Sequence, residues 1–441
     1  MMQRQKSFRR LINLALVSAV FGSASHAQAE GKVDLELGYE STVYFEDGQR
    51  PDGTALKQRT NNSFSAELEY YHSWADDTQS FTFTPFYRYD ETDEERTHFD
   101  VREFIWHQVA DSYELKVGVG KVFWGVTESA HLVDIVNQTD AVEAIDGEDK
   151  LGQPMVQLLL EEDWGNLDVF ILPYHRERTF TGANARLSAG LETADAVYEA
   201  EDEESNVDVA LRWNHYWDEL EYSLSYFHGT SREPVLGATI ASDGTGETLP
   251  YYPLIEQYGL ELQYLYEDWA WKLESIYRIG MPENGIQLGD RYVGIYEQAA
   301  IPAFAVPASF TIADEKDYYA TAAGFEYTQV GIFESRMDLG WVVEHLYDSR
   351  GDKAAVTASE HDVLLATRWV ANDADDSELL AGVFYDYEYG DYSLSLEGNT
   401  RIFDSISLEL EGRFFMIEDE ENPQYSFRDE DFVKLSLAYF Y

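Results

Sequence analysis

Segments of about ten residues in which apolar and polar side chains alternate recur along nearly the whole chain. The last of them places Val433, Leu435, Leu437 and Tyr439 on one face and ends at Tyr441. Because side chains on a strand point to opposite faces with a period of two, each segment has one apolar and one polar face. A tilted strand of this length crosses the hydrocarbon core of a membrane. The pattern therefore predicts a transmembrane β-barrel whose apolar face contacts lipid.

Residues 1–29 have the composition of a secretory signal peptide. They contain a basic segment with four Lys or Arg residues, an apolar segment over residues 11–21, and the small-residue cleavage motif Ala27-Gln28-Ala29. The apolar segment is shorter than the roughly 18 residues that a transmembrane helix needs, and no later segment is longer. We expect cleavage before Glu30, which leaves residues 30–441 as the barrel domain.

The chain is strongly acidic, with 83 Asp and Glu against 31 Lys and Arg and a formal net charge of -52. This charge excludes nucleic acid as a partner. The chain has no cysteine, which excludes a disulfide framework and thiolate metal sites. We expect no cofactor and no metal centre in the barrel. The 31 Tyr and 10 Trp residues suit the aromatic girdles at the two membrane interfaces.

The alternation predicts about eighteen antiparallel strands in up-and-down order. They span residues 33–45, 63–74, 80–90, 97–108, 112–122, 154–162, 166–174, 205–216, 219–229, 257–266, 269–279, 317–328, 335–347, 360–370, 377–387, 391–402, 405–416 and 430–441. In the segment 97–108, Glu103 falls on the apolar face beside Val101 and Ile105, which indicates a bulge or a shifted register. A count of sixteen strands remains an alternative.

The connectors separate a membrane barrel from a soluble β-sandwich, which shows the same alternation. Connectors after even-numbered strands are expected to have six residues or fewer, as at Trp217-Asp218 and Phe403-Asp404. Several connectors after odd-numbered strands are long: 46–62, 123–153, 175–204, 230–256 and 280–316. Short periplasmic turns and long external loops are typical of bacterial outer-membrane barrels, and an even number of strands returns both termini to the periplasm.

The polar face of the strands is expected to line a wide lumen, because barrels of sixteen to eighteen strands leave an aqueous channel. The predicted lumen-lining residues are the basic Arg88, Arg102, Lys116, Arg212, Arg278, Arg336, Arg368, Arg401 and Arg413 and the acidic Glu67, Glu69, Glu261, Asp338 and Glu409. One interpretation is a transverse field that orients polar solutes, with an acidic excess that favours cations. The other is that these residues only form ion pairs that brace the barrel.

The predicted external loops are acidic, above all at Glu192, Asp195, Glu199 and residues 201–204. Divalent cations at these carboxylates could bridge to lipopolysaccharide, because calcium prefers oxygen ligands. The alternative is a solvated surface, since no spaced calcium-loop motif is present. The sequence leaves both open.

The loop 123–153 is less polar than the others. Its residues Leu132, Val133, Ile135 and Val136 are poorly suited to water, so we expect the loop to fold into the lumen as a constriction or partial plug. Gly125 would permit a sharp turn after the strand. The candidate constriction residues are Trp124, Gly125, Asp134, Asn137 and Asp140. Asn137 and Asp140 have a structural alternative, in which they only cap turns through hydrogen bonds to the backbone.

Gly120-Lys121, Trp124-Gly125 and the Asn-x-x-Asp turn from Asn137 to Asp140 form a motif. Through this motif the chain resembles Gram-negative outer-membrane β-barrel proteins of the large porin-like class. The resemblance implies a porin or exporter-like group and supplies no substrate. The sequence thus predicts an outer-membrane channel for passive diffusion of small polar solutes.

Two other classes of protein are alternatives to the channel. An adhesin or structural barrel could bind a partner through its long acidic loops. A barrel enzyme is disfavoured, because no Gly-x-Ser-x-Gly or His-Glu-x-x-His motif is present and Ser225 and His228 are expected on opposite faces. The oligomeric state is open.

Overall fold

The computed structural model describes residues 31–49, 54–144, 146–188, 190–240, 245–282, 286–288, 291–293, 315–354 and 359–441. The expected signal peptide lies outside these residues, as does most of the expected loop 280–316, so cleavage of the signal peptide stays a prediction. None of the helices in the described residues is long and apolar enough to cross a membrane.

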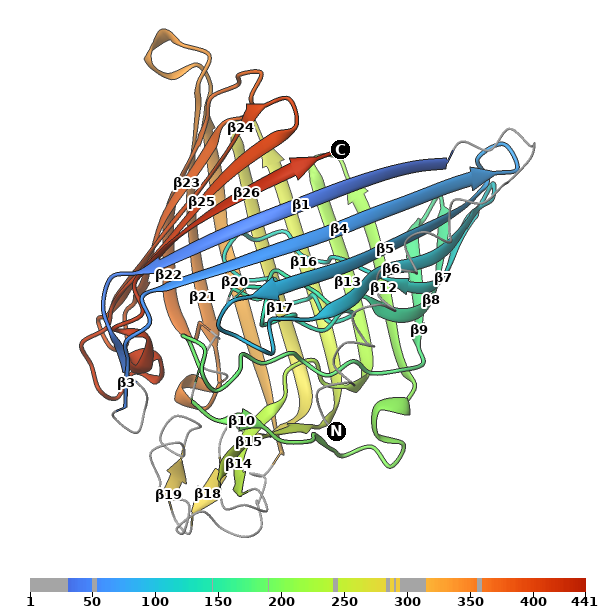
Figure 1. The fold of residues 1–441 in the computed structure, drawn as a ribbon. Helices are drawn as coiled ribbons and strands as arrows, with labels where there is room; N and C mark the ends of the chain where they lie inside the picture. The colour runs from blue at the N-terminus through green and yellow to red at the C-terminus, as the bar shows by residue number, and fades with distance from the viewer. Residues whose placement is uncertain are drawn as a thin grey trace, which may run out of the picture.

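Eighteen antiparallel strands form one sheet that closes on itself (Figure 1). In order around the barrel they are β1 (Gly31–Tyr44), β4 (Thr60–Trp74), β5 (Gln79–Asp90), β6 (Phe99–Val109), β7 (Tyr113–Gly120), β8 (Gln153–Glu162), β9 (Gly165–Leu172), β12 (Asp208–Trp217), β13 (Leu220–Thr230), β16 (Leu254–Tyr266), β17 (Trp269–Pro282), β20 (Glu315–Gln329), β21 (Asp338–Asp348), β22 (His361–Val370), β23 (Glu378–Asp386), β24 (Tyr392–Phe403), β25 (Ile406–Met416) and β26 (Phe432–Phe440). Closure is made by β1, which pairs with β4 on one edge and β26 on the other. Each expected strand overlaps one of these, so the all-β barrel of eighteen strands is confirmed and the alternative of sixteen is wrong.

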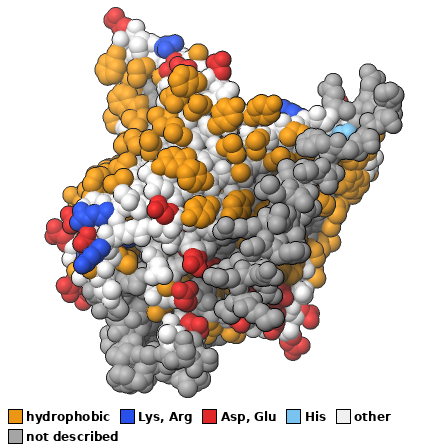
Figure 2. All heavy atoms as spheres, in the orientation of Figure 1, with side chains coloured by type: hydrophobic (Ala, Val, Ile, Leu, Met, Phe, Trp, Pro, Cys, Tyr) orange, Lys and Arg blue, Asp and Glu red, His pale blue; other side chains and the backbone are white. Residues whose placement is uncertain are grey.

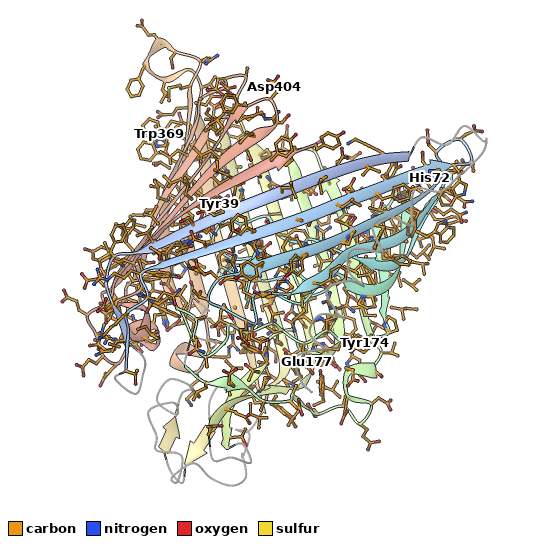
Figure 3. All side chains as sticks on the ribbon, in the orientation of Figure 1. Tyr39, His72, Tyr174, Glu177, Trp369 and Asp404 are labelled. Atoms are coloured by element: carbon orange, nitrogen blue, oxygen red, sulfur yellow. The ribbon has the colours of Figure 1, made fainter. Side chains whose placement is uncertain are left out.

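The two ends of the barrel carry different connectors. One end has short turns such as 218–219, 267–268 and 404–405, and the first and last strands also begin and end there (Figure 1). The opposite end carries long loops with short strands of their own: β2 (Gly48–Gln49), β3 (Ala55–Leu56), β10 (Glu192–Thr193), β11 (Val197–Tyr198), β14 (Val235–Ile240), β15 (Gly246–Tyr252), β18 (Ile286–Leu288) and β19 (Arg291–Val293). Figure 3 labels Asp404 at the short-turn end and Tyr174 and Glu177 at the long-loop end.

Two of the short turns are longer than expected. The turn between β20 and β21 spans residues 330–337 and contains a 3-10 turn at Ile332–Glu334, and the turn between β22 and β23 spans residues 371–377. Asn372 joins these turns, because its side-chain amide donates to the Arg336 carbonyl at 2.8 Å and to Asp338 at 2.7 Å. Arg336 therefore lies exposed in a turn and not on the lumen face, so its assignment to the lumen was wrong. The error arose because the strand begins at Asp338, later than the alternation indicated.

The outer face of the barrel is apolar. Exposed outward-facing side chains include Val33, Leu37, Phe64, Tyr87, Leu224, Tyr277, Leu365 and Leu435. Figure 2 shows hydrophobic side chains in a broad band across the strands, and Figure 3 labels Tyr39 and Trp369 on the outer wall. Aromatic rings stack near the short-turn end, as between Trp269 and Trp271 with centroids 5.8 Å apart. An apolar band bounded by aromatic rings is the surface that a barrel presents to lipid.

The irregularity expected at Glu103 is a β-bulge. Thr84 pairs with Glu103 and the next residue, Pro85, pairs with Val101, so Arg102 is the extra residue. Pro85 has no N–H to donate, which makes this a favourable place for a break in the ladder. The bulge shifts the phase of β6, and Phe104 is exposed outside while Ile105 is buried inside. The expectation that Ile105 faces lipid was therefore wrong.

An apolar core fills part of the barrel interior. Inward-facing residues of β8, β9, β13, β16 and β17 pack there against the loop after β7; they include Met155, Phe170, Leu172, Phe227, Ile255 and Ile276. The continuous apolar run Val169-Phe170-Ile171-Leu172 marks a strand that is apolar on both faces. This core holds the loop residues Trp124, Val133, Ile135 and Val136 against one side of the lumen.

Candidate functional site

The loop between β7 and β8, residues 121–152, enters the barrel and binds the wall of β17. Glu274 of β17 is fully buried. It accepts hydrogen bonds from the backbone N–H groups of Val126 at 2.7 Å and Thr127 at 3.0 Å and from the Thr127 hydroxyl at 2.8 Å. A buried carboxylate that accepts several donors is a strong anchor, because each bond is charge-assisted. Glu274 thus fixes the start of the loop.

A second buried carboxylate, Glu344 of β21, holds the next residues of the loop. It accepts from the N–H of Glu128 at 2.9 Å and from the N–H and hydroxyl of Ser129 at 2.8 and 2.5 Å. On the neighbouring strand β22, Arg368 donates to the Glu128 carboxylate at 2.5 Å. In the closed order of strands, β21 and β22 lie almost opposite β7 and β8. The loop therefore crosses the width of the lumen.

The loop returns along a set of inward arginines. Asp140 is fully buried and accepts from Arg102 at 2.6 Å and from Thr179 at 2.8 Å. Glu143 pairs with Arg88 at 2.6 Å. These ion pairs tie the returning part of the loop to β5 and β6, so the loop is fixed on two opposite sides of the barrel.

Asn137 joins the two ends of the loop. Its side chain accepts from the N–H of Val122 at 2.9 Å and donates to the carbonyls of Gly120 and Leu151 at 2.9 and 2.8 Å. All three partners are backbone groups. Hydrogen bonds of this kind are expected if Asn137 only caps turns. A role of Asn137 and Asp140 in lining the constriction stays a prediction.

Trp124 and Gly125 lie where the loop turns into the lumen. Trp124 is buried, with its ring 5.7 Å from that of Phe170. Gly125 has a φ of 146°, and a Cβ there would lie 2.7 Å from His131 Nδ1 and 3.0 Å from a Glu274 oxygen. Only glycine is compatible with this backbone and this close approach, as the sequence predicted for a sharp turn.

His131 lies between two carboxylates. Its Nε2 is 3.2 Å from Glu148, and its Nδ1 is 3.9 Å from Glu274. Burial alone would lower the pKa of His131, but the interactions with the two carboxylates outweigh burial and raise it to about 10. The imidazolium is thus the charged form at neutral pH. Asp134 lies in the same loop, and burial raises its pKa to about 6 although Lys150 is 3.4 Å away.

We expect docking of this loop to weaken in alkali. The pKa of His131 in the docked loop lies above the ordinary value near 6.5. Protonated His131 therefore stabilises docking fully below about pH 6.5, and this stabilisation is lost as the pH rises through about 10. Protonation of Asp134 below about pH 6 removes a buried charge and strengthens docking, so docking also weakens as the pH rises through that value. If the loop limits the current, single-channel conductance in planar bilayers should rise between about pH 6.5 and 10, the range that this shift defines. The control is His131→Gln, which should flatten the rise; identical pH profiles would contradict this role.

A cavity of ≈ 630 Å³ lies between the loop and strands β22–β25. The loop contributes Glu128, His131 and Asp146, and the barrel contributes Phe384 and Arg413 among others. Arg413 binds Asp146 at 3.1 Å and Glu397 at 2.7 Å. The described residues of β22–β25, on the side of the barrel opposite the apolar core, thus border an open space.

The other residues expected in the lumen fall into three groups. Arg212 and Arg278 are paired inside the barrel, with Glu261 at 2.9 Å and Glu233 at 3.1 Å. Glu67, Glu69, Glu409 and Lys116 occupy inward positions, and the described residues provide no ion pair for them. Asp338 and Arg401 lie at the short-turn rim, where half of the Arg401 side chain is exposed. A role in solute passage stays a prediction for all of them.

His98, Asp140 and Glu143 are spaced closely enough to hold a metal ion. Asp140 and Glu143 are, however, each bound to a buried arginine at 2.6 Å. Two guanidinium groups already balance the two carboxylates, so the electrostatics disfavour a divalent cation. The cluster is an ion-pair network that fixes the loop.

The sequence reasoning missed both anchoring glutamates and a buried arginine. The partners of Glu274 and Glu344 are mostly backbone N–H groups far along the chain, and no sequence pattern marks such contacts. Arg232 binds Asp208 at 2.7 Å, with both side chains buried, and donates to the Val136 carbonyl at 3.1 Å. Because Arg232 lies in an expected external loop, the sequence did not indicate this role.

These features define a class of protein: a transmembrane β-barrel of eighteen strands with a loop folded into its lumen. No family model matches the chain, and no curated protein matches its sequence.

Among solved structures, the chain is similar to three outer-membrane proteins. The first is a BenF-like porin from Pseudomonas fluorescens Pf-5, with a TM-score of 0.49 and 9% identity over 94% of this chain and 98% of that chain. The second is Pseudomonas aeruginosa OccK5 (OpdH), with a TM-score of 0.48 and 10% identity over 93% and 98%. The third is the outer membrane channel DcaP of Acinetobacter baumannii, with a TM-score of 0.43 and 10% identity over 95% and 99%.

Proposed function

We propose that this protein is an outer-membrane channel for passive diffusion of small polar solutes, with a constriction formed by the loop 121–152 and a mild preference for cations. The observation that carries the proposal is the loop itself, which Glu274 and Glu344 hold across the lumen next to a cavity of ≈ 630 Å³. A lumen of this strand number is wide enough for water. A loop fixed inside it narrows the path.

The preference for cations rests on unpaired carboxylates in the lumen. Glu36 of β1 faces Glu67 of β4 in the strand register, and Glu36 interacts electrostatically with both Glu67 and Glu409. Within the described residues no Lys or Arg forms an ion pair with any of the three. Such a group attracts cations and repels anions, as rings of carboxylates do in cation channels.

The proposed partners are outer-membrane lipid, lipopolysaccharide and small polar solutes. Divalent cations at the acidic external loops remain part of the proposal. No catalytic role is assigned, and nucleic acid is excluded by charge. A purified barrel that never conducts in a planar bilayer would contradict the channel and favour the surface-binding alternative.

The test of selectivity uses three neutral substitutions. In a potassium chloride gradient we expect stepwise openings and a cation-selective reversal potential, which the variant Glu36→Gln, Glu67→Gln, Glu409→Gln should shift toward zero. The matched control neutralises three exposed carboxylates in the short turns, Glu219, Glu267 and Asp404, and should shift the potential less. Anion selectivity of the unmodified channel would overturn the charge argument.

A further inference from the structure

We propose that the cavity beside β22–β25 selects organic cations that carry an apolar body, such as aromatic ammonium ions. This inference rests on the proposed channel function and names the solute class for which the channel is built. It is carried by a ladder of inward-facing residue pairs on β22 and β23 that changes from acidic to apolar along the cavity wall.

The acidic end of the ladder is a pair of aspartates. Asp362 and Asp386 are directly opposite each other in the strand register, and both line the cavity. Asp386 accepts from the backbone N–H of Glu388 at 2.9 Å and from Asn422 at 3.3 Å. Within the described residues neither aspartate is in an ion pair with Lys or Arg. Two adjacent carboxylates without a counter-ion attract a cation.

Most of the other charged groups in and beside the cavity are paired, whereas Asp391 and Arg178, which also line it, form no ion pair with the described residues. Arg368 binds Glu128 at 2.5 Å, and Arg413 binds Asp146 and Glu397. His131 is bound to Glu148 at 3.2 Å. Paired groups offer little net charge to a solute. The carboxylates of Asp362, Asp386 and the neighbouring Asp391, which accepts from Asn422 at 3.1 Å, outnumber the guanidinium of Arg178 on the described wall of the cavity.

The next two rungs of the ladder are apolar. Leu364 pairs with Phe384, and Ala366 pairs with Gly382. Leu364 and Ala366 are buried, and the half-buried Phe384 and Leu380 pack against them at the cavity. Rungs on one face of a strand are about 7 Å apart. An ammonium group at the aspartates therefore places a ring attached to it over Phe384, where burial and an aromatic contact both add affinity.

The apolar rungs of the cavity wall are complementary to an occupant with apolar surface. A metal ion would use the aspartates only, and an anion would be repelled by them. An aromatic or alkyl ammonium ion matches both parts of the wall. Charge complementarity thus favours the organic cation over the other two.

Block of the potassium current tests the proposal. Benzyltrimethylammonium is compared with tetramethylammonium, which lacks the ring, and with benzoate, which carries the opposite charge. We expect benzyltrimethylammonium to block at a concentration about tenfold lower than tetramethylammonium, because part of its ring is buried, and we expect benzoate not to block.

Substitutions assign this block to the ladder. Asp362→Asn and Asp386→Asn should each raise the half-blocking concentration of both cations several-fold. Phe384→Thr should raise it only for benzyltrimethylammonium. The control Glu219→Gln, an exposed carboxylate in a short turn outside the cavity, should leave the ratio of the two cations unchanged.

Calorimetry on the detergent-solubilised barrel gives the same ranking without any current, so that failure of the channel function is distinguished from failure of this inference. Equal affinity for the two cations, or affinity unaffected by both aspartate substitutions, would overturn the proposal. Calcium binding at the aspartates with no preference for the aromatic cation would also overturn it.

Discussion

Replacing Glu274 and Glu344 together with alanine is expected to increase single-channel conductance about twofold, because it releases the loop from the far wall of a pore whose width limits the current. Both carboxylates are buried, and together they accept bonds from Val126, Thr127, Glu128 and Ser129. Hydrogen bonds to a charged group contribute about 1.5–3 kcal/mol each. Without them the loop has no polar anchor at β17 and β21. Planar-bilayer recordings measure the change.

The matched control removes two inward carboxylates that make no described bond to the loop, Glu67→Ala with Glu409→Ala. It changes the charge of the lumen by the same amount and should alter selectivity more than conductance. Heat-modified mobility in gel electrophoresis should show that both double variants still form barrels. If releasing the loop leaves the conductance unchanged, the loop does not limit the current.

The second large effect is expected at Arg232. Replacement with methionine leaves the fully buried Asp208 without its cation and removes the bond to the Val136 carbonyl. Breaking a buried ion pair from one side costs about 3–5 kcal/mol. The free energy of unfolding, measured with denaturant in detergent micelles, should fall by that amount.

Arg401→Met is the matched control for this substitution. The Arg401 side chain is 51% exposed and lies 3.8 Å from Asp376, and an exposed pair contributes only about 0–1 kcal/mol. Adding Asp208→Asn to Arg232→Met should recover part of the lost stability, because it removes the unpaired charge. Equal losses in Arg232→Met and Arg401→Met would contradict the proposed contribution of the buried pair.

The fold could be predicted because each strand contacts lipid on one face, which imposes the period-two pattern over most of the barrel. The prediction failed where a segment departs from this period-two pattern. At β6 the bulge shifts the phase, so Ile105 turns inward. At β9 both faces are apolar, because Phe170 and Leu172 pack against the loop inside the barrel. Arg336 was assigned to the lumen because alternation continues past the end of a strand.

The candidate site could be predicted only in part. The apolar residues of the loop 123–153 indicated that it leaves water, and Gly125 indicated where it turns. The sequence could not indicate what the loop binds, since Glu274 and Glu344 contact backbone groups 147 and 215 residues away. The ladder of Asp362, Leu364 and Phe384 could not be predicted either, because it depends on the register between two strands.

The position of the anchors has a consequence for folding. Residues 126–129 are synthesised long before β17 and β21, and the bonds that join them close loops of more than a hundred residues. Forming contacts at such separation carries a large entropic cost until the intervening strands are in place. We therefore expect the wall to assemble first and the loop to dock afterwards, so that the newly closed barrel passes through a state that is wider inside than the mature one.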